Sequence, residues 1–399
     1  IIVGVQSLII TGIAQLWEGM ELFTVNTLGL PFHSGLIPTL LVLAGIFFFG
    51  VRYAASESKT DLYVLAALSI FFSFFAFGWK AIIVVPVAGA IFYYGLGKAD
   101  RHLLQVLIFS ALLSVVGFST IGVIIVRAQA DPPVNMNRPS DPIRLLSYVN
   151  REQYGERPLL YGPNFDARPV DNNIEERYGQ VSTPEGDRYE ITDEKLSYKY
   201  NNSDKVLFPR MGDDSQNRPE KYRAWIDKPA GEPTVFDNIK FLFRYQLGWM
   251  YWRYFAWNFI GRQNGEQGYY SWDKKSGHWE SGIKFIDEAR LYDKDKLPAY
   301  MENDQSKNHY YFLPFLFGIL GLIFHFRKNR EEAFGLLGLF IITGIGIIIY
   351  SNQPPNEPRE RDYVLVGSFF TFCIWIGMGV LWVFEMLRNK IGGVGAAAL

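Results

Sequence analysis

Residues 352–363, NQPPNEPRERDY, join two apolar runs and combine three prolines with a run of charged side chains. Arg359 and Arg361 carry guanidinium groups, which can hold a phosphate through paired hydrogen bonds. Asp362 or its neighbour Glu360 can orient these arginines or contact a hydroxyl group. A plain connector between helices needs none of these groups, so we interpret the loop as a candidate substrate-binding segment. The alternative is an ion-paired loop that ties the polar part of the chain to the helices.

A pair of carboxylates follows the first apolar run, residues 1–14. Glu18 and Glu21 lie three residues apart within residues 15–35, and this spacing places them on one face of a helix. We interpret them as candidates for substrate contact in a cavity at the membrane surface. The alternative is an interfacial amphipathic helix with Trp17 and Phe23 in the headgroup layer.

Further cations lie where a lipid phosphate could reach them. Arg127 follows an apolar run, at the depth where a long basic side chain meets the headgroups. Residues 237–259 predict a helix capped by Asp237, in which Arg253 alternates with aromatic residues such as Trp257. This pattern suggests a surface for a lipid-linked or sugar-like ligand, because rings stack on sugars and arginine binds phosphate. An interfacial helix and an aromatic core helix are the alternatives.

The elements that must position these residues are mostly membrane spans. A spanning helix needs about 20 apolar residues, and the polar stretch 127–309 separates two apolar regions. We therefore predict a transmembrane bundle over 1–126, a soluble domain over 127–309, and three further spans over 310–390 with a loop at 351–363. The candidate spans are 1–14, 36–54, 62–78, 81–97, 103–126, 310–326, 333–350 and 364–387. Because the chain opens inside an apolar run without a methionine, we expect it to be part of a longer protein.

Short basic loops assign the sides of the membrane. Arginine and lysine cluster at 52–59, 98–101, 327–330 and 388–390, and alternation through the spans puts all of them on one side. The positive-inside bias makes that side cytoplasmic. Residues 15–35, the 127–309 insert and the 351–363 loop are then extracytoplasmic.

Two local signals predict that the insert is folded. Asp141 followed by Pro142 is typical of a helix start, and the helix should end near Gly155. The following RPLLYG, residues 157–162, predicts a buried strand. The insert is therefore predicted to be an α+β domain.

Several function classes lack a signal. The net charge of −1 and the absence of a basic stripe argue against a nucleic-acid partner. The sequence has no phosphate-binding glycine loop, no HExxH and no CxxC, and its five histidines have no ligand spacing. We therefore predict no metal and no cofactor. The single cysteine, Cys373, cannot pair within the chain.

Four segments resemble a large bacterial multi-pass family formerly of unknown function. They are LLSYVNREQYGERPLLYGPNFDA, MYWRYFAWNFIGRQN, KNHYYFLPFLFGILGLIFHF and NQPPNEPRERDYVLVGSFFTFCIWIGMGV, and the resemblance extends over about residues 10–390. The family is grouped with GT-C-type membrane glycosyltransferases and is related to protein O-mannosyltransferases. The resemblance implies a GT-C-like α-helical polytopic membrane protein with an α+β extracytoplasmic insert, in the bacterial inner membrane. It also implies an acidic general base in an early loop, and no matching loop is present here, so no catalytic residue is carried over.

The expected function follows from this resemblance. The enzyme would take a sugar from a polyprenyl-phosphate-linked donor and place it on an acceptor protein or glycan outside the cytoplasm. Membrane lipids are the other expected partners. The alternative is a non-catalytic structural or accessory subunit of an envelope complex. A transporter fits less well, because the spans carry few ionisable residues and show no inverted repeat.

Overall fold

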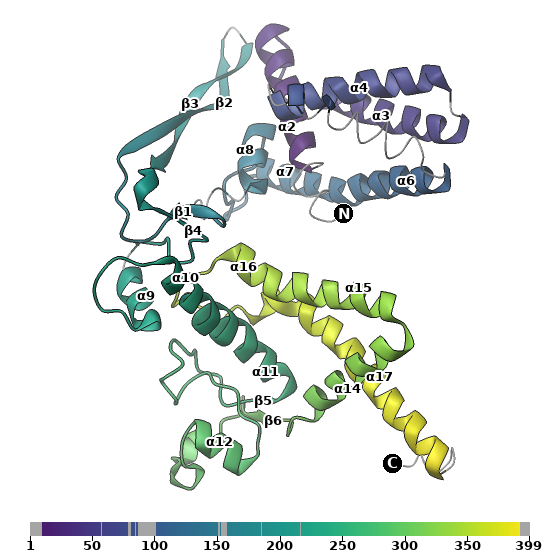
Figure 1. The fold of residues 1–399 in the computed structure, drawn as a ribbon. Coiled ribbons are helices and arrows are strands. Elements are labelled where there is room, and N and C mark those ends of the chain that lie inside the picture. Colours follow the sequence, from purple (N-terminus) through teal and green to yellow (C-terminus); the bar gives the residue numbers. More distant parts are fainter. Residues whose placement is uncertain are drawn as a thin grey trace. The chain divides into compact units, whose positions relative to one another are not determined.

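The computed structural model describes residues 10–56, 58–78, 81–83, 85–86, 101–150, 152, 158–184, 186–215 and 217–391. By its internal contacts the chain divides into two compact units: Ile1–Glu156 with Asn172–Tyr198, and Arg157–Asp171 with Lys199–Leu399. We call them the N-terminal and the C-terminal unit. Among the described residues helices dominate, and the strands pair in two-stranded ladders (Figure 1). The expected helical protein with a small sheet region is confirmed, but the predicted 127–309 domain is divided between the two units.

Four helices in the described part of the chain are long and apolar enough to cross a membrane, as in a multi-pass membrane protein. They are Leu36–Ser56, Ile108–Gln129, Arg330–Ser351 and Asp362–Arg388. They match the predicted spans 36–54, 103–126, 333–350 and 364–387. The predicted spans 62–78 and 310–326 are helices too, but the second has only 16 residues, which reach about 24 Å and fall short of the hydrocarbon core. Most of 1–14 and 81–97 lies outside the described residues.

The N-terminal unit consists of helices and one long hairpin. Its elements are α2 (Thr11–Leu22), a π-helical stretch at Phe23–Thr27, α3 (Leu36–Ser56), α4 (Lys59–Phe77), α6 (Arg101–Phe118), a 3-10 turn at Ser119–Ile121, α7 (Gly122–Gln129), α8 (Pro142–Val149), β2 (Asp171–Thr183) and β3 (Gly186–Lys199). Asp141 caps α8, and its Oδ1 accepts a hydrogen bond of 2.9 Å from the backbone N–H of Arg144. The predicted cap is confirmed, although the helix ends at Val149, earlier than predicted.

Helix α2 lies in the interior of this unit. Trp17 packs against Ile125 of α7 and Leu145 of α8 and is only 7% exposed. It is therefore a core residue of this unit and not an exposed anchor side chain. Phe23 is 49% exposed.

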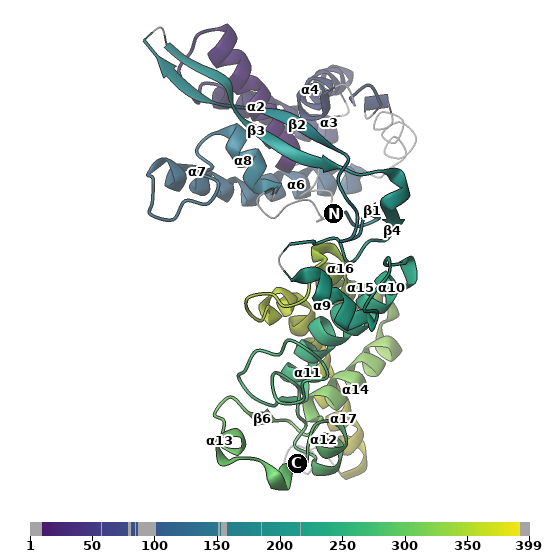
Figure 2. The same ribbon diagram turned by 90° about the vertical axis from the view of Figure 1, so that its left-hand side faces the viewer.

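The hairpin is anchored by one tyrosine. Its two strands run side by side over their length, and most of their side chains are exposed (Figure 2). Tyr189 of β3 is 2% exposed and packs edge-to-face on Phe32. Its backbone exchanges two hydrogen bonds with the Asn26 side chain. These contacts explain why the strands belong with the N-terminal helices and not with the rest of the insert.

The C-terminal unit surrounds an aromatic helix. Its elements are β1 (Tyr161–Pro163), a 3-10 turn at Asn202–Asp204, β4 (Lys205–Leu207), α9 (Arg218–Ile226), α10 (Val235–Phe241), a π-helical stretch at Leu242–Trp252, α11 (Arg253–Phe259), β5 (Gly261–Arg262), α12 (Lys284–Arg290), a 3-10 turn at Lys294–Lys296, α13 (Ala299–Glu302), β6 (Asn308–His309), α14 (Leu313–Lys328), α15 (Arg330–Ile341), a π-helical stretch at Ile342–Gly346, α16 (Ile347–Ser351), a 3-10 turn at Asp362–Leu365 and α17 (Val366–Ile391). Strand β1 pairs antiparallel with β4, and β5 with β6. Among the described residues of the predicted strand 157–162, the last two belong to β1 and residues 158–160 do not form a strand. Leu160 is 77% exposed, so the prediction of a buried strand is wrong there.

Residues 235–259 form the core helix of this unit. The helix begins one turn earlier than predicted: Thr234 is the cap and Asp237 is the third residue of a capping box. Its buried residues include Tyr245, Trp249 and Tyr254, which pack with Trp225 of α9. The alternative of an aromatic core helix is therefore correct.

Helices α14 and α17 approach each other closely at glycines. Gly321 of α14 faces the backbone of Trp375 in α17, and a Cβ atom there would overlap the Trp375 carbonyl. Gly379 of α17 faces the Phe317 carbonyl in the same way. Because glycine has no side chain, the two helix backbones can come this close together.

Candidate functional site

The loop between the last two candidate spans, residues 352–361, folds onto the core helix. The Asn352 side chain donates a hydrogen bond of 3.1 Å to the carbonyl of Pro209 and accepts one of 3.0 Å from Gln246. The hydroxyl of Tyr245 donates to the Pro354 carbonyl at 3.0 Å. Asn352 and Asn356 adopt left-handed backbone angles, with φ of 41° and 57°, which asparagine tolerates better than most residues. The loop is thus fixed at several points.

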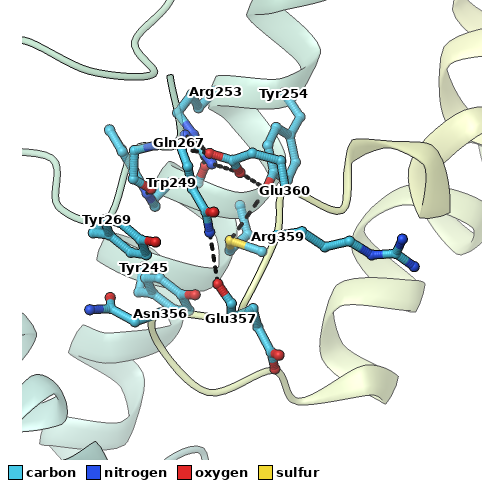
Figure 3. A pocket seen from close by; sticks show the side chains of 12 residues that line it. Tyr245, Trp249, Arg253, Tyr254, Gln267, Tyr269, Asn356, Glu357, Arg359 and Glu360 are labelled. Carbon is cyan, nitrogen blue, oxygen red and sulfur yellow. Dashed lines mark hydrogen bonds and ion pairs between the residues drawn. The ribbon is translucent and has the colours of Figure 1, made fainter. Parts of the chain in front are cut away.

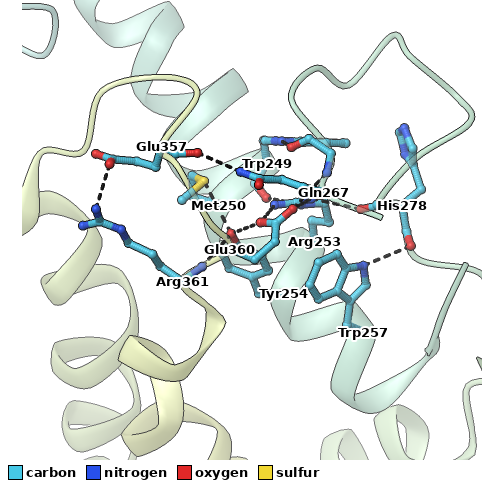
Figure 4. A network of polar contacts seen from close by, with 12 residues as sticks. Trp249, Met250, Arg253, Tyr254, Trp257, Gln267, His278, Glu357, Glu360 and Arg361 are labelled. Carbon is cyan, nitrogen blue, oxygen red and sulfur yellow. Dashed lines mark hydrogen bonds and ion pairs between the residues drawn. The ribbon is translucent and has the colours of Figure 1, made fainter. Parts of the chain in front are cut away.

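Glu360 is the centre of a polar network (Figure 4). Its carboxylate accepts two hydrogen bonds from Arg253, of 3.0 and 2.7 Å, one of 3.0 Å from the backbone N–H of Gly268, and one from the hydroxyl of Tyr254. Arg253 is 2% exposed and lies over the rings of Trp249 and Trp257, at 4.2 and 4.7 Å. Burial raises the pKa of Tyr254, so its hydroxyl stays protonated and donates to Glu360.

This geometry changes the interpretation of Arg253 and Trp257. The Arg253 guanidinium is held by Glu360 and by the rings beside it. The Trp257 indole N–H donates a hydrogen bond of 3.0 Å to the His278 carbonyl. Burial lowers the pKa of His278 to about 4, so its ring is neutral at pH 7. Both predicted ligand contacts are therefore interior residues, because their polar atoms are satisfied within the fold.

The three other predicted residues of the loop differ among themselves. Arg361 forms an ion pair of 2.7 Å with Glu357, which is 8% exposed. Asp362 is half-buried at the start of the turn that leads into α17. Arg359 is exposed; it donates one hydrogen bond of 3.2 Å to the Tyr363 hydroxyl and lies over that ring.

A recess adjoins the loop (Figure 3). Tyr245, Tyr269 and Asn356 lie on one side of it, and the Arg359 side chain extends away from it. The Gln267 side chain donates a hydrogen bond of 2.7 Å to the Glu357 carbonyl. Sequence reasoning missed Tyr269 and Asn356; the only local signal was Asn356 within a proline-rich turn.

In the N-terminal unit the two predicted carboxylates have separate roles. Glu21 is fully buried and accepts hydrogen bonds from the backbone N–H groups of His33 and Gly35 and from the Tyr189 hydroxyl. It holds the loop after α2 in place. Its position in the interior, with these partners, does not support direct contact with a ligand.

Glu18 lies in a more acidic environment. It is half-buried, and burial, followed by the negative charges of Asp141, Glu175 and Glu152, raises its pKa to about 7. Asp141 is 1% exposed, its pKa is also raised by burial, and its Oδ2 makes no hydrogen bond. Sequence reasoning paired Glu18 with Glu21, whereas the fold brings it close to Asp141, because α2 packs on α8.

Arg127 lies in the last turn of α7, at the end of the candidate span Ile108–Gln129, and its side chain is exposed. This position agrees with the predicted one at the end of an apolar run.

Within the described residues, one group of carboxylates lies close enough to hold a metal ion: Glu288, Asp293 and Asp295. Lys284 pairs with Asp295 and Lys296 with Asp293, so lysines neutralise the exposed charges. We therefore interpret the group as a network of ion pairs at the protein surface.

Comparison with known proteins gives one family match. A family of unknown function (DUF8416) matches residues 155–243, which is less than a quarter of the chain. No curated protein and no solved structure matches the chain.

Proposed function

We propose that the protein is a GT-C-type membrane glycosyltransferase, or the C-terminal part of one. It would transfer a sugar from a polyprenyl-phosphate-linked donor to an acceptor protein or glycan on the outer side of the bacterial inner membrane. The family resemblance and the candidate spans support this proposal. The main observation behind the proposal is that the Arg359 guanidinium is exposed at the start of a candidate span.

Arg359 differs from its neighbours in having an available charge. Glu360 is fixed by Arg253, and Arg361 is paired with Glu357, but the exposed guanidinium of Arg359 has the Tyr363 ring and hydroxyl as its described contacts. The candidate span Asp362–Arg388 begins shortly after it. In this proposal a lipid phosphate lies at this depth, where a guanidinium can stabilise the charge that develops on a leaving phosphate.

The N-terminal unit offers complementary groups. Arg127 is an exposed cation at the end of another candidate span. Glu18, whose pKa is about 7, can both accept and donate a hydrogen bond to a hydroxyl group near neutral pH. In this proposal Arg127 contacts lipid phosphate and Glu18 contacts a hydroxyl of the substrate, while the general base belongs to the N-terminal region that the family resemblance implies.

The test is transfer from a polyprenyl-phosphate sugar by the full-length protein. We expect Arg359→Ala and Arg359→Lys to lower turnover about 100-fold, because a lysine cannot reproduce the two-pronged contact. Arg168→Ala is the matched control, since Arg168 is an exposed arginine of the same unit, away from the loop. Full activity in both Arg359 variants would refute the role of this residue.

The structure also provides an observation for the accessory-subunit alternative. Arg253, Trp257 and Glu360 hold the loop on the core helix, which is a structural use of charges that the sequence suggests for binding. Absence of transfer by a folded full-length protein, together with co-purification of envelope proteins, would favour this second function.

A further inference from the structure

Helix α14 has the surface of a short membrane crossing, although it has only 16 residues. No aspartate, glutamate, lysine or arginine lies between Leu313 and Phe326. Its exposed apolar side chains recur every three or four residues and therefore form one stripe along the helix. They are Leu313, Leu316, Ile319 and Ile323. Arg327 and Lys328, both exposed, follow directly, as basic residues do at the end of a helix in lipid.

Helix α14 begins further in than the two candidate spans beside it. The Phe315 ring of its first turn lies 6.4 Å from the Phe372 ring, which lies 6.2 Å from the Phe340 ring. Phe372 comes ten residues after the start of the span Asp362–Arg388, and Phe340 eleven residues before the end of the span Arg330–Ser351. At 1.5 Å per residue, both spans extend about 15 Å beyond the first turn of α14.

The outer ends of these two spans are packed inside the folded domain. Ile348 and Leu365 are 3% and 0% exposed and belong to the same core cluster as Trp225 of α9. The buried Arg210 guanidinium donates a hydrogen bond of 2.8 Å to the Ile349 carbonyl. Protein packing therefore explains why these ends are apolar, and lipid is not needed to cover them.

A polar segment limits how far out the hydrocarbon can reach. Phe259 at the end of α11 packs on Phe372, with ring centroids 4.6 Å apart, and the chain then continues as residues 261–309. This segment carries exposed charges such as those of Lys284 and Lys296. Charged and irregular chain is not stable in contact with acyl chains. The hydrocarbon boundary therefore lies no further out than about the level of Phe372.

Exposed aromatic residues gather at the same level. Trp252 is 40% exposed, and its ring lies 6.0 Å from the Phe315 ring. Tyr310 and Tyr311, which directly precede α14, are also exposed. Tryptophan and tyrosine are enriched at membrane–water interfaces, because their rings are apolar at one end and polar at the other.

We propose that Trp252, Tyr310 and Tyr311 form an aromatic collar in the lipid headgroup layer, and that α14 crosses the hydrocarbon from this collar to Arg327. The crossing is about 24 Å long, roughly 6 Å less than a typical hydrocarbon core, so the bilayer is thinned around this unit. The headgroup layer adds roughly 5–8 Å outside the hydrocarbon. A lipid phosphate then lies between the collar and Arg359. The inference concerns lipid contact and requires no transfer reaction.

The first experiment measures the depth of single spin labels in the full chain, reconstituted in phosphatidylcholine vesicles. Cys373 is replaced by alanine, and a nitroxide is attached to a cysteine at one of four exposed positions: Leu316, Lys328, Val366 or, as the aqueous control, Lys296. Collisions with oxygen report hydrocarbon, and collisions with a water-soluble nickel chelate report water. We expect Leu316→Cys to meet oxygen, and Val366→Cys, Lys328→Cys and the control to meet the chelate.

Val366 decides between this boundary and the one given by the apolar run, because it lies four residues inside the candidate span. A label there that meets oxygen and is protected from the chelate would overturn the proposal. A Leu316 label reached by the chelate would overturn it too. A Leu316 label reached by neither probe would mean that protein covers α14, which also contradicts lipid contact.

A substitution tests the collar separately. Tyr311→Asn removes the ring and keeps a residue that tolerates the left-handed backbone, with φ of 53°. We expect a lower unfolding temperature in vesicles and an unchanged one in detergent micelles, whose interface adapts to the protein. Tyr300→Asn, at an exposed tyrosine of α13, is the control and should change neither. An equal effect of Tyr311→Asn in vesicles and micelles, or none in vesicles, would overturn the collar.

Discussion

Two arginines near the same loop have different surroundings. Arg253 is 2% exposed and shares two hydrogen bonds with Glu360, whereas Arg359 is exposed and contacts the Tyr363 side chain. A buried guanidinium without its carboxylate is an uncompensated charge in a poorly solvated site. Loss of a contact at an exposed guanidinium changes the free energy of unfolding little, because water replaces the lost partner. The two residues should therefore respond differently to substitution.

We predict that Glu360→Gln lowers the free energy of unfolding by about 3–5 kcal/mol, because Arg253 stays charged and buried. Arg359→Gln, one residue away, should change it by less than about 0.5 kcal/mol. Thermal unfolding of the detergent-solubilised protein measures both. Equal melting temperatures for the two variants would show that the Arg253–Glu360 pair contributes little to stability.

At the scale of elements, the contact between α14 and α17 depends on glycine. The backbones approach each other at Gly321 and Gly379, and each glycine faces a carbonyl of the opposite helix. Gly335 of α15 is also a helical glycine, but a Cβ atom there would meet no atom within 4 Å. The same substitution therefore has opposite expected effects at these positions.

We predict that Gly321→Ala lowers stability by about 1–3 kcal/mol, because the added methyl group forces α14 and α17 apart. Gly335→Ala should leave stability unchanged or raise it by up to about 1 kcal/mol, since alanine favours the helix. Unfolding of the two variants in the same detergent makes the comparison. A stable Gly321→Ala variant would indicate that the helices can separate without loss of packing.

At the scale of the whole molecule, the candidate spans set the membrane topology. Arg330–Ser351 and Asp362–Arg388 are consecutive, so their connecting loop lies on one side of the membrane and the basic residues 327–330 lie on the other. From the positive-inside bias we expect the side of residues 327–330 to be cytoplasmic. The same rule applied to the N-terminal unit predicts that its hairpin lies outside.

We predict that single cysteines replacing Arg168 and Glu190 react with an impermeant thiol reagent in intact cells. A cysteine replacing Lys328 should react only after the membrane is opened. The native Cys373 is exposed on α17 and is replaced by alanine in all three variants. Labelling of the Lys328 position in intact cells would reverse the orientation, and labelling of only one of the first two would place the units on opposite sides.

The sequence by itself determined the features that depend on neighbouring residues. Apolar length predicted the four spans, and the pair Asp141–Pro142 predicted the start of α8. The proline-rich loop and the position of Arg127 at the end of a span also followed from local pattern. The core helix was predicted within a few residues at each end, although its cap is Thr234.

Only the tertiary structure decided which of the candidate side chains stay available. Arg253 and Glu360 lie 107 residues apart, and Asn356 and Tyr270 lie 86 apart, so no local pattern shows that they meet. Residue type alone could not separate Arg253, which is fixed in the interior, from Arg359, which is exposed. The physical reason is that packing brings hydrogen-bond partners from distant parts of the chain. A polar group that meets such a partner in the interior is fixed there, whereas a polar group that stays exposed is available to a ligand.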